Sequence, residues 1–396
     1  MLDWYLWFDS SPNPPASWYT SVQSYFNALL YPGDAIVPAD RWSYISDTAS
    51  YEQFYDEGKT LGYGLFVNGL ELRLPLKVRM VEPQSPAAIE GLVRGDVILS
   101  VNGRSAADLI AAKDFGVLNP TKEGDTLAVT IASGTGSKTI TLTAATYSLT
   151  PLPVARVLTL ANGTKAGYLM MKDFITQAEG PLADAFRDFR AAGATELILD
   201  LRYNGGGLIS TSTLLASLVA GNVNHGKLFT SLNYNVKQTS QNASYRFSST
   251  HSGFSRVVVL TGERTCSASE LVINGLKPYV QVVTVGGQTC GKPFGFSPVS
   301  SCSNTYSVVN FESFNALGEG RYYNGIAATC AATDEFSDQL GDSNESLTVA
   351  AITYLQSAQC PVPSSTESGL AKTLTIKRHT LLSTPELGER RGMVRN

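Results

Sequence analysis

A strand, a helix and a second strand follow one another in the third quarter of the chain. Residues 257–260 and 280–285 are valine-rich runs of strand length, and residues 268–276 are good helix formers. Parallel strands joined by one crossover helix usually lie side by side, so residues just past their C-terminal ends meet at one edge of the sheet. We therefore predict an α/β fold that brings Ser267 and Lys292 to this edge, where open α/β sheets carry their chemistry.

Ser267 and Lys292 form a pair that can cleave an acyl bond. A serine hydroxyl is a poor nucleophile until a base removes its proton, and a lysine acts as that base only when burial lowers its pKa. Serine–lysine pairs are an accepted variant of the serine triad. Because Ser267 would begin the helix, the N–H group of Ala268 would face the oxyanion that develops on the substrate. We interpret Ser267 as nucleophile, Lys292 as base and Ala268 as part of an oxyanion hole.

Two other interpretations fit parts of the same segment. Ser267-x-x-Glu270 has the spacing of a capping box, in which the serine caps the helix and the glutamate reaches back to it. Residues 286–292 follow the phosphate-loop pattern G-x-x-x-x-G-K, but Pro293 stands where that loop needs a hydroxyl for magnesium. Nucleotide binding is therefore the weaker alternative, and a purely structural capping role for Ser267 stays open.

The residues around this pair also carry a family resemblance. The pattern T-x-S-A-S-E at 265–270, a 25-residue step from Ser267, and then T-x-G-K ending at Lys292 resemble the carboxyl-terminal processing proteases, or tail-specific proteases. These are serine peptidases with a serine–lysine dyad. The resemblance implies that Ser267 is the nucleophile, Lys292 the general base and Glu270 a catalytic acidic residue, on a ClpP/crotonase-like α/β core. Phe296 departs from the pattern, since some members have a glutamine there that orients the lysine.

Residues 61–148 read as a small β domain of short strands and turns. The pattern S-P-A-x-x-x-G-L-x-x-G-D-x-I-x-x-V-N-G at 85–103 resembles a PDZ domain. The resemblance implies a loop whose amides bind a peptide's C-terminal carboxylate, with the peptide added as a strand along the free edge of residues 65–67. The residues of that loop are Gly62, Tyr63, Gly64 and Leu65. The alternative is a small β domain without a ligand.

The catalytic domain is expected at residues 149–360. A buried strand at 196–201 ends in D-L-R-Y-N-G-G-G at 200–207, whose glycines let backbone amides approach a ligand closely. This segment resembles the family's D-L-R-x-N-x-G-G. The resemblance implies that the amide of Gly206, or that of Gly207, completes the oxyanion hole. A plain glycine turn and a phosphate-binding turn are the alternatives.

The flanking segments predict a helical N-terminal region and a tail. Residues 1–60 are rich in aromatic side chains, with a helix expected at 17–30. The side chains that this helix should bury are Trp18, Val22, Tyr25, Phe26 and Leu29. Further helices are expected at 181–192 and 343–356, and residues 361–396 are expected to be a flexible tail without a role.

Composition limits the class of protein. A chain of 396 residues with 43% hydrophobic residues suggests two or three domains. The net charge is only −4 and no basic tract precedes the tail, so we expect no nucleic-acid partner. No apolar run reaches the roughly eighteen residues of a membrane span. Residues 1–30 lack the pattern of a signal peptide, so we expect any export signal to be absent from this chain.

The five cysteines follow no zinc spacing, and we expect neither a metal nor a cofactor. Cys266 and Cys290 each lie within two residues of the proposed pair, so a disulfide and two buried free thiols are equally open. Cys302 and Cys330 are a second candidate pair. The chain has only three histidines (His225, His251 and His379), none in a recognisable motif, and no G-x-S-x-G elbow, which favours lysine as the base.

Two functions from different classes remain. The first is a serine endopeptidase of the C-terminal processing type, whose PDZ domain recognises the C-termini of protein substrates. The second is a catalytically inactive peptide-binding adaptor with the same fold, for which Phe296 is the best argument. Ser267, Lys292 and the glycine turn favour the peptidase, because an inactive scaffold does not need all three. The expected partners are proteins or peptides, with a homodimer left open, and the expected location is periplasmic, cell-envelope or secreted.

Overall fold

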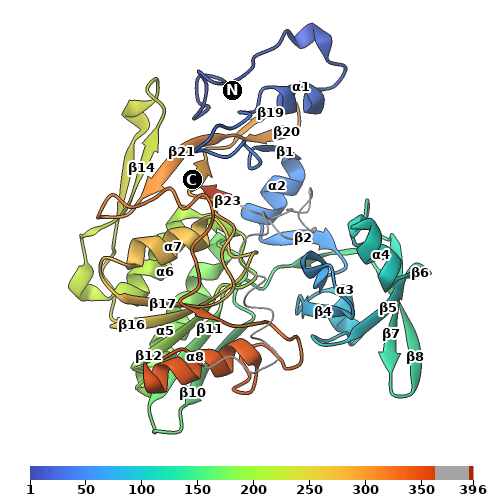
Figure 1. Ribbon diagram of the computed structural model, residues 1–396, viewed down its shortest axis with the longest axis vertical. Helices are drawn as coiled ribbons and strands as arrows, with labels where there is room; N and C mark the ends of the chain where they lie inside the picture. The colour runs from blue at the N-terminus through green and yellow to red at the C-terminus, as the bar shows by residue number, and fades with distance from the viewer. Residues whose placement is uncertain (362–391, 396) are drawn as a thin grey trace.

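The computed structural model describes residues 1–361 and 392–395. Figure 1 shows a core of helices and strands, with the strands of the PDZ-like segment set to one side and the N-terminal segment at the top. Helices and sheets are mixed throughout, which confirms the predicted α/β multidomain fold. Within the described residues, we find no helix with the length and apolar character needed to cross a membrane.

A six-stranded, mostly parallel sheet forms the centre of the molecule. In spatial order its strands are β10 (Val154–Thr159), β11 (Lys165–Met170), β12 (Glu196–Asp200), β16 (Arg256–Thr261), β17 (Gln281–Gly286) and β22 (Cys330–Ala331). Only β10 runs antiparallel to its neighbour. The strands predicted at 257–260 and 280–285 are therefore present and lie side by side in parallel.

Helices cover both faces of this sheet. Helices α5 (Glu179–Ala192), α6 (Ile209–Ala220) and α7 (Ala268–Leu276) pack on one face, and α8 (Ser346–Ser357) packs on the other. Successive residues of β16 divide between these two cores, because side chains alternate along a strand. Val257 and Val259 face the first set of helices, and Val258 faces α8. Burial on both faces explains why this strand is continuously apolar.

A second six-stranded sheet packs over α7. Its order is β13 (Gly206–Leu208), β23 (Gly392–Val394), β18 (Phe294–Phe296), β21 (Val309–Phe314), β14 (Leu228–Tyr234) and β15 (Ala243–Arg246). Every residue of α7 is buried, because the helix lies between the two sheets. Strand β23 falls within the segment predicted to be a flexible tail, so that prediction is wrong for residues 392–394. Residues 362–391 of the predicted tail lie outside the described part of the chain.

The PDZ-like segment forms a sheet with its own apolar core. The strand order is β3 (Leu65–Val67), β4 (Leu76–Val81), β5 (Val97–Val101), β7 (Thr126–Ser133) and β8 (Gly136–Thr143), with β6 (Arg104–Ser105) beside β5. The remaining elements are helices α3 (Pro86–Ile89) and α4 (Ala106–Ala112), and the paired strands β2 (Lys59–Gly62) and β9 (Ala145–Ser148). We propose domain boundaries at 60/61 and 148/149, where β2 and β9 lie side by side.

The N-terminal region is less helical and more exposed than predicted. Helix α1 (Val22–Ala28) is shorter than expected, and β1 (Tyr44–Asp47) leads into α2 (Thr48–Tyr55). Strand β1 pairs with β20 (Asn304–Ser307), which pairs with β19 (Val299–Ser301).

The predicted burial of this helix is only partly correct. Phe26 and Leu29 are buried and Tyr25 is half-buried, but Trp18 is 73% and Val22 is 56% exposed. The prediction assumed one continuous helix from residue 17. Because a separate 3-10 turn at Ala16–Trp18 precedes α1, Trp18 does not extend the buried face of that helix.

Candidate active site

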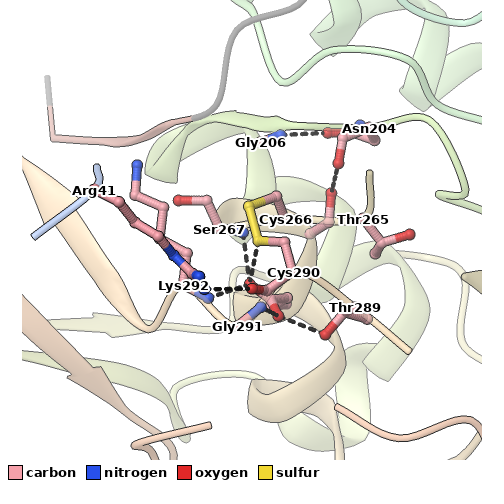
Figure 2. Close-up of a disulfide and its surroundings, with 12 residues drawn as sticks. Arg41, Asn204, Gly206, Thr265, Cys266, Ser267, Thr289, Cys290, Gly291 and Lys292 are labelled. Atoms are coloured by element: carbon pink, nitrogen blue, oxygen red, sulfur yellow. Dashed lines mark hydrogen bonds between the residues drawn. A yellow bond between two sulfur atoms is a disulfide. The ribbon is translucent and has the colours of Figure 1, made fainter. Parts of the chain in front are cut away.

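The ends of β16 and β17 carry Ser267 and Lys292 to one edge of the central sheet. The strands pair in parallel up to Thr261 and Gly286, and α7 begins directly after Ser267. Lys292 follows the turn that leaves β17. Both side chains are fully buried, and Figure 2 shows the two residues on one side of a disulfide.

Glu270 connects the two turns. Its carboxylate accepts hydrogen bonds from the N–H group of Ser267 at 2.9 Å and from those of Gly291 and Lys292 at 2.8 Å each. The hydroxyl of Thr289 donates another at 2.5 Å (Figure 2). Burial raises the pKa of Glu270, and these donors oppose that rise. A carboxylate in the first turn of α7 therefore holds the backbone of the serine and of the lysine together.

A disulfide between Cys266 and Cys290 joins the same two turns. The alternative of two free thiols is therefore wrong. Atoms of Cys266, Glu270 and Cys290 lie within 4.8 Å of one another, as in some metal sites. Because the two sulfur atoms are bonded to each other, this group offers no thiolate ligand.

The predicted pairing of Cys302 with Cys330 is wrong. Cys330 is bonded to Cys360, and Cys302 is a free, exposed thiol. Cys302 lies in the turn between β19 and β20, next to the N-terminal region, whereas Cys330 lies in β22 at the edge of the central sheet. The two cysteines belong to different sheets.

Ser267 has a backbone conformation that residues with a side chain rarely adopt. Its φ is 60° and its ψ is −110°, a type of strain that costs about 1–3 kcal/mol and gathers at functional sites. Its buried Oγ has no hydrogen-bond partner among the described residues. Only the Glu270 half of the capping box is formed, so capping does not explain the hydroxyl. The hydrogen bond between Ser267 and Lys292 that a dyad requires is not made in this arrangement.

Lys292 lies against aromatic rings. Its Nζ is 3.8 Å from the ring centroid of Phe296 and 5.5 Å from that of Trp42. Attraction to a ring face favours the charged form of a lysine. Phe296, the residue that departs from the family pattern, therefore contacts the amine directly and favours its protonated state.

Gly206 and Ala268 face each other beside the serine. A Cβ added to Gly206 would lie 3.0 Å from the amide nitrogen of Ala268 and 2.1 Å from the carbonyl oxygen of Gly392. Gly206 has a φ of 112°, and only glycine fits this combination of conformation and crowding. Its N–H group donates to Oδ1 of Asn204 at 2.8 Å. The two amides are thus brought together, but that of Gly206 is paired within its own turn.

Gly207 is the other glycine considered for the oxyanion hole. It also has a positive φ, at 140°, and a Cβ there would lie 2.1 Å from the carbonyl oxygen of Phe174. Its backbone forms a bridge with Phe174 on one side and pairs with Met393 of β23 on the other. Both glycines belong to β13, but Gly206 is the one that lies next to Ala268.

The expected carboxylate loop of the PDZ-like sheet does not lie open to a peptide. Strand β3 is the last strand of its sheet, but its side chains are all buried, and Phe66 packs in the core of the catalytic domain. The carbonyl of Val67 accepts a hydrogen bond from Nε of Arg79 at 3.0 Å. Tyr63 and Leu65 belong to the PDZ-like core. The predicted free edge is therefore covered in this arrangement, and the loop is not part of the serine–lysine edge.

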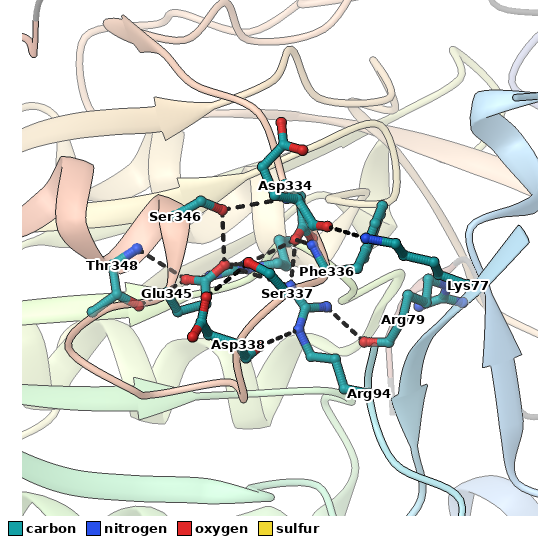
Figure 3. A network of polar contacts seen from close by, with 12 residues as sticks. Lys77, Arg79, Arg94, Asp334, Phe336, Ser337, Asp338, Glu345, Ser346 and Thr348 are labelled. Carbon is teal, nitrogen blue, oxygen red and sulfur yellow. Dashed lines mark hydrogen bonds and ion pairs between the residues drawn. The ribbon is translucent and has the colours of Figure 1, made fainter. Parts of the chain in front are cut away.

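A buried ionic network joins the PDZ-like sheet to the catalytic core, and Figure 3 shows Arg94 beside Asp334, Asp338 and Glu345. Arg94 donates to the hydroxyl of Tyr203 at 2.7 Å and forms an ion pair with Asp334. Glu345 accepts two hydrogen bonds from Arg202 at 2.6 and 2.9 Å. Burial alone would raise the pKa of Glu345, but the hydrogen bonds and charge of Arg202 lower it to about 2. Because Arg202 and Tyr203 precede Gly206, Arg94 contacts the segment that shapes the site.

A second contact between the units lies at Glu82. Its carboxylate accepts a hydrogen bond at 2.6 Å from the N–H group of Thr150, just beyond β9. Burial raises the pKa of Glu82 to about 7, against the Thr150 hydrogen bond and the positive charge of Lys172. Glu82 therefore changes charge near neutral pH at the junction of two domains.

Three residues that contact the site were not predicted from the sequence: Arg41, Trp42 and Asn204. Arg41 lies 4.7 Å from the ring of Trp42 and donates to the carbonyl of Cys290 at 3.4 Å. Burial lowers the pKa of Arg41, and the charge of Glu270 opposes this. The first two lie in a loop without a motif. Asn204 lies inside the glycine segment already quoted, and its side chain bonds the N–H of Gly206.

The histidines do not contribute to the site in the described structure. His225 and His251 are exposed, whereas the Ser267 hydroxyl is buried and accepts no hydrogen bond from them. His379 lies outside the described residues.

The α/β core, the attached PDZ-like sheet and the serine–lysine edge define a PDZ-containing, peptidase-type fold. Peptidase family S41 matches residues 165–323, the S41 N-terminal domain matches residues 1–44, and a PDZ domain matches residues 77–115. Residues 165–323 are therefore similar to peptidase family S41, and residues 1–44 are similar to the N-terminal domain of that family.

Named relatives agree with this family. The chain is 29% identical over 249 residues to a carboxyl-terminal-processing protease of Picosynechococcus, covering 59% of this chain and 55% of that protein. It is 25% identical over 275 residues to a carboxyl-terminal-processing protease of Synechocystis, covering 69% of this chain and 61% of that protein. The chain therefore spans less than two thirds of these relatives. An S41-type protein of Bacteroides fragilis has a similar crystal structure, with a TM-score of 0.72, 25% identity, and coverage of 91% of this chain and 96% of that one.

Proposed function

We propose that this chain is a serine endopeptidase of the C-terminal processing type that hydrolyses peptide bonds of protein substrates. Ser267 is the nucleophile and Lys292 the general base. The observation that carries this assignment is the carboxylate of Glu270, which bonds the backbone of both residues and so fixes the two turns against each other. The match to peptidase family S41 over residues 165–323 and the similarity to carboxyl-terminal-processing proteases support it.

In this mechanism Oγ of Ser267 attacks the carbonyl carbon of the scissile peptide bond while its proton passes to the neutral amine of Lys292. The N–H group of Ala268 stabilises the oxyanion, and that of Gly206 joins it once Asn204 releases it. Lys292 then protonates the leaving amine. The same lysine next takes a proton from a water molecule, which hydrolyses the acyl-enzyme ester and restores the free serine. Glu270 positions both turns and does not touch the substrate.

The described arrangement is a closed state of this site. Ser267 and Lys292 are both fully buried, and Lys292 lies over Phe296 instead of bonding the serine. A substrate therefore needs an opening that exposes the serine and turns the amine toward it. Hydrogen bonds between catalytic groups often form only in the substrate complex.

We assign recognition of substrate C-termini to the PDZ-like sheet. Its loop residues are Gly62, Tyr63, Gly64 and Leu65. Binding there requires β3 to leave the catalytic core, so the Arg94 network must break or rearrange. A homodimer remains the proposed assembly. Two disulfides support a location outside the reducing cytoplasm, in the periplasm, the cell envelope or the medium.

A serine-reactive fluorophosphonate probe tests the assignment. The chain should be labelled at Ser267 and should cleave an unstructured polypeptide, and both activities should disappear in Ser267→Ala. Ser301→Ala, which changes an exposed serine, is the matched control and should behave like the parent. Peptide binding without labelling or cleavage would instead favour the inactive adaptor, for which the contact between Lys292 and Phe296 is the supporting observation.

A further inference from the structure

Strand β23 fills a gap between the two segments that lead away from the proposed dyad. It pairs in parallel with β13, which contains the oxyanion glycine, and also in parallel with β18, which begins two residues after Lys292. The sheet order is β13, β23, β18, so these two strands meet only through β23. Without it, each would present an unpaired edge beside the site.

The backbone of β23 lies directly against the proposed oxyanion hole. The N–H group of Gly392 donates to the carbonyl of Gly205 at 3.1 Å. A Cβ on Gly206 would come within 2.1 Å of the carbonyl oxygen of Gly392. At the other end, the N–H group of Arg395 donates to the carbonyl of Phe296 at 3.0 Å. An extended backbone therefore crosses from the glycine turn to the ring that holds Lys292.

Each side chain of this strand occupies a defined position. Met393 is 0% exposed and packs in the core that includes α7, and Val394 is 3% exposed among the side chains of the N-terminal region. Nη1 of Arg395 donates to the hydroxyl of Tyr234 at 3.0 Å and to the carbonyl of Gln241 at 2.8 Å. The space between β13 and β18 that β23 occupies, called the slot below, thus accepts a small residue, two apolar residues and a basic residue in succession.

We propose that β23 is an intramolecular occupant of the slot in which an extended substrate peptide binds, and that it holds the enzyme in its closed state. This inference rests on the proposed peptidase function. It adds how that activity is regulated and which peptide sequences the slot prefers. Proteins commonly bind extended peptides by adding them as a strand to a sheet edge, with pockets for successive side chains. Removal of β23 would leave such an edge along β13 and β18, beside Ser267.

The proposal has two consequences for substrates. A peptide must compete with a segment tethered to the same chain, whose effective concentration is high. The favoured peptide has a small residue followed by two apolar residues and an arginine or lysine, because these side chains match those of residues 392–395 in the slot. A small residue is favoured at the first position because a Cβ on Gly392 would lie 3.1 Å from the hydroxyl oxygen of Tyr55, and the basic residue is bound by Tyr234 and Gln241.

The test compares the full chain with a variant that lacks residues 392–395. If the strand occupies the slot about nine-tenths of the time, its deletion should raise kcat/KM for a short unstructured peptide by about tenfold. Synthetic Gly-Met-Val-Arg, capped at both ends, should then inhibit the deletion variant and have little effect on the full chain. The reversed peptide Arg-Val-Met-Gly is the control and should inhibit neither. Arg395→Ala, which removes only one anchor, should give a smaller increase in kcat/KM.

The opposite pattern would refute the proposal. If β23 is an ordinary structural strand, its deletion lowers activity or thermal stability, and adding Gly-Met-Val-Arg restores activity. Should the deletion variant fail to fold, Arg395→Ala decides, because an unchanged or lower kcat/KM contradicts a blocking strand. Calorimetry of the peptide with a deletion variant that also carries Ser267→Ala measures slot binding without catalysis. If the peptide binds this variant but no variant hydrolyses a substrate, the binding site proposed for β23 is supported and the peptidase function is rejected. If the peptide does not bind, the proposed binding site is rejected.

Discussion

Replacing Glu82 by glutamine should remove a pH dependence of stability. Its carboxyl has a pKa of about 7 in the folded protein against 4.5 for the ordinary group. A raised carboxyl pKa means that the folded state binds the proton more tightly than the unfolded chain does. The stabilisation is therefore complete below pH 4.5 and is lost as the pH rises through 7. At about 1.4 kcal/mol per pKa unit, the difference between the folded and unfolded pKa values of Glu82 corresponds to at most about 3 kcal/mol of unfolding free energy.

Chemical denaturation at several pH values between 5 and 8.5 measures this effect. The free energy of unfolding of the parent should fall relative to that of Glu82→Gln as the pH rises, because the glutamine keeps an acceptor for Thr150 without a charge. Glu90→Gln, which changes an exposed carboxylate of the same domain, is the control. A difference between parent and Glu82→Gln that stays constant within about 0.5 kcal/mol over this range would contradict the burial argument.

Four further predictions concern the site and its connections. Lys292→Arg should abolish hydrolysis while the protein still unfolds cooperatively, since arginine stays protonated; turnover near the parental rate would reject the lysine base. Phe296→Leu removes the ring that favours charged Lys292, so the pH–rate profile should move to lower pH; an unchanged or higher midpoint contradicts this role. Glu345→Gln removes one of the two buried carboxylates paired with Arg202, the other being Asp200, and should cost about 3–5 kcal/mol of unfolding free energy at pH 7, with the loss shrinking as pH falls toward 2. Free-acid peptides should bind the PDZ-like sheet more tightly than amidated ones in fluorescence titrations; equal affinities would argue against carboxylate recognition.

The sequence predicted the elements around Ser267 well because their signals are local. A valine-rich strand, a helix and another strand in succession fix a parallel pair, and this pairing brings residues on either side of the helix together. Cys266 and Cys290 meet for the same reason, which is why their proximity was predictable although their bonding was not. Glu270 was recognised from spacing, but its bonds to Gly291 and Lys292 depend on the turn after β17.

Features that depend on distant segments were missed or wrong. Trp42 reaches Lys292 from a loop about 250 residues away in sequence, and nothing local marks that contact. Strand β23 has only three residues and gains its stability from two partners far from it in the chain, so composition alone predicted a tail. Cys330 finds Cys360 because the end of α8 lies near β22, a proximity set by tertiary packing.

The Cys266–Cys290 disulfide ties assembly of the site to the place where the chain folds. It closes a loop with a sequence separation of 24 residues, and a loop of that size typically contributes about 3–4 kcal/mol to stability. In a reducing compartment the two turns are joined by the hydrogen bonds of Glu270 and by the one that the N–H group of Cys290 donates to the carbonyl of Thr265. Both cysteines are almost completely buried, so a reductant reaches the bond only when the protein opens. A molecule that has folded under oxidising conditions therefore keeps its cross-link after the conditions change, and the proportion of oxidised chains reports where they folded and not the conditions they later meet.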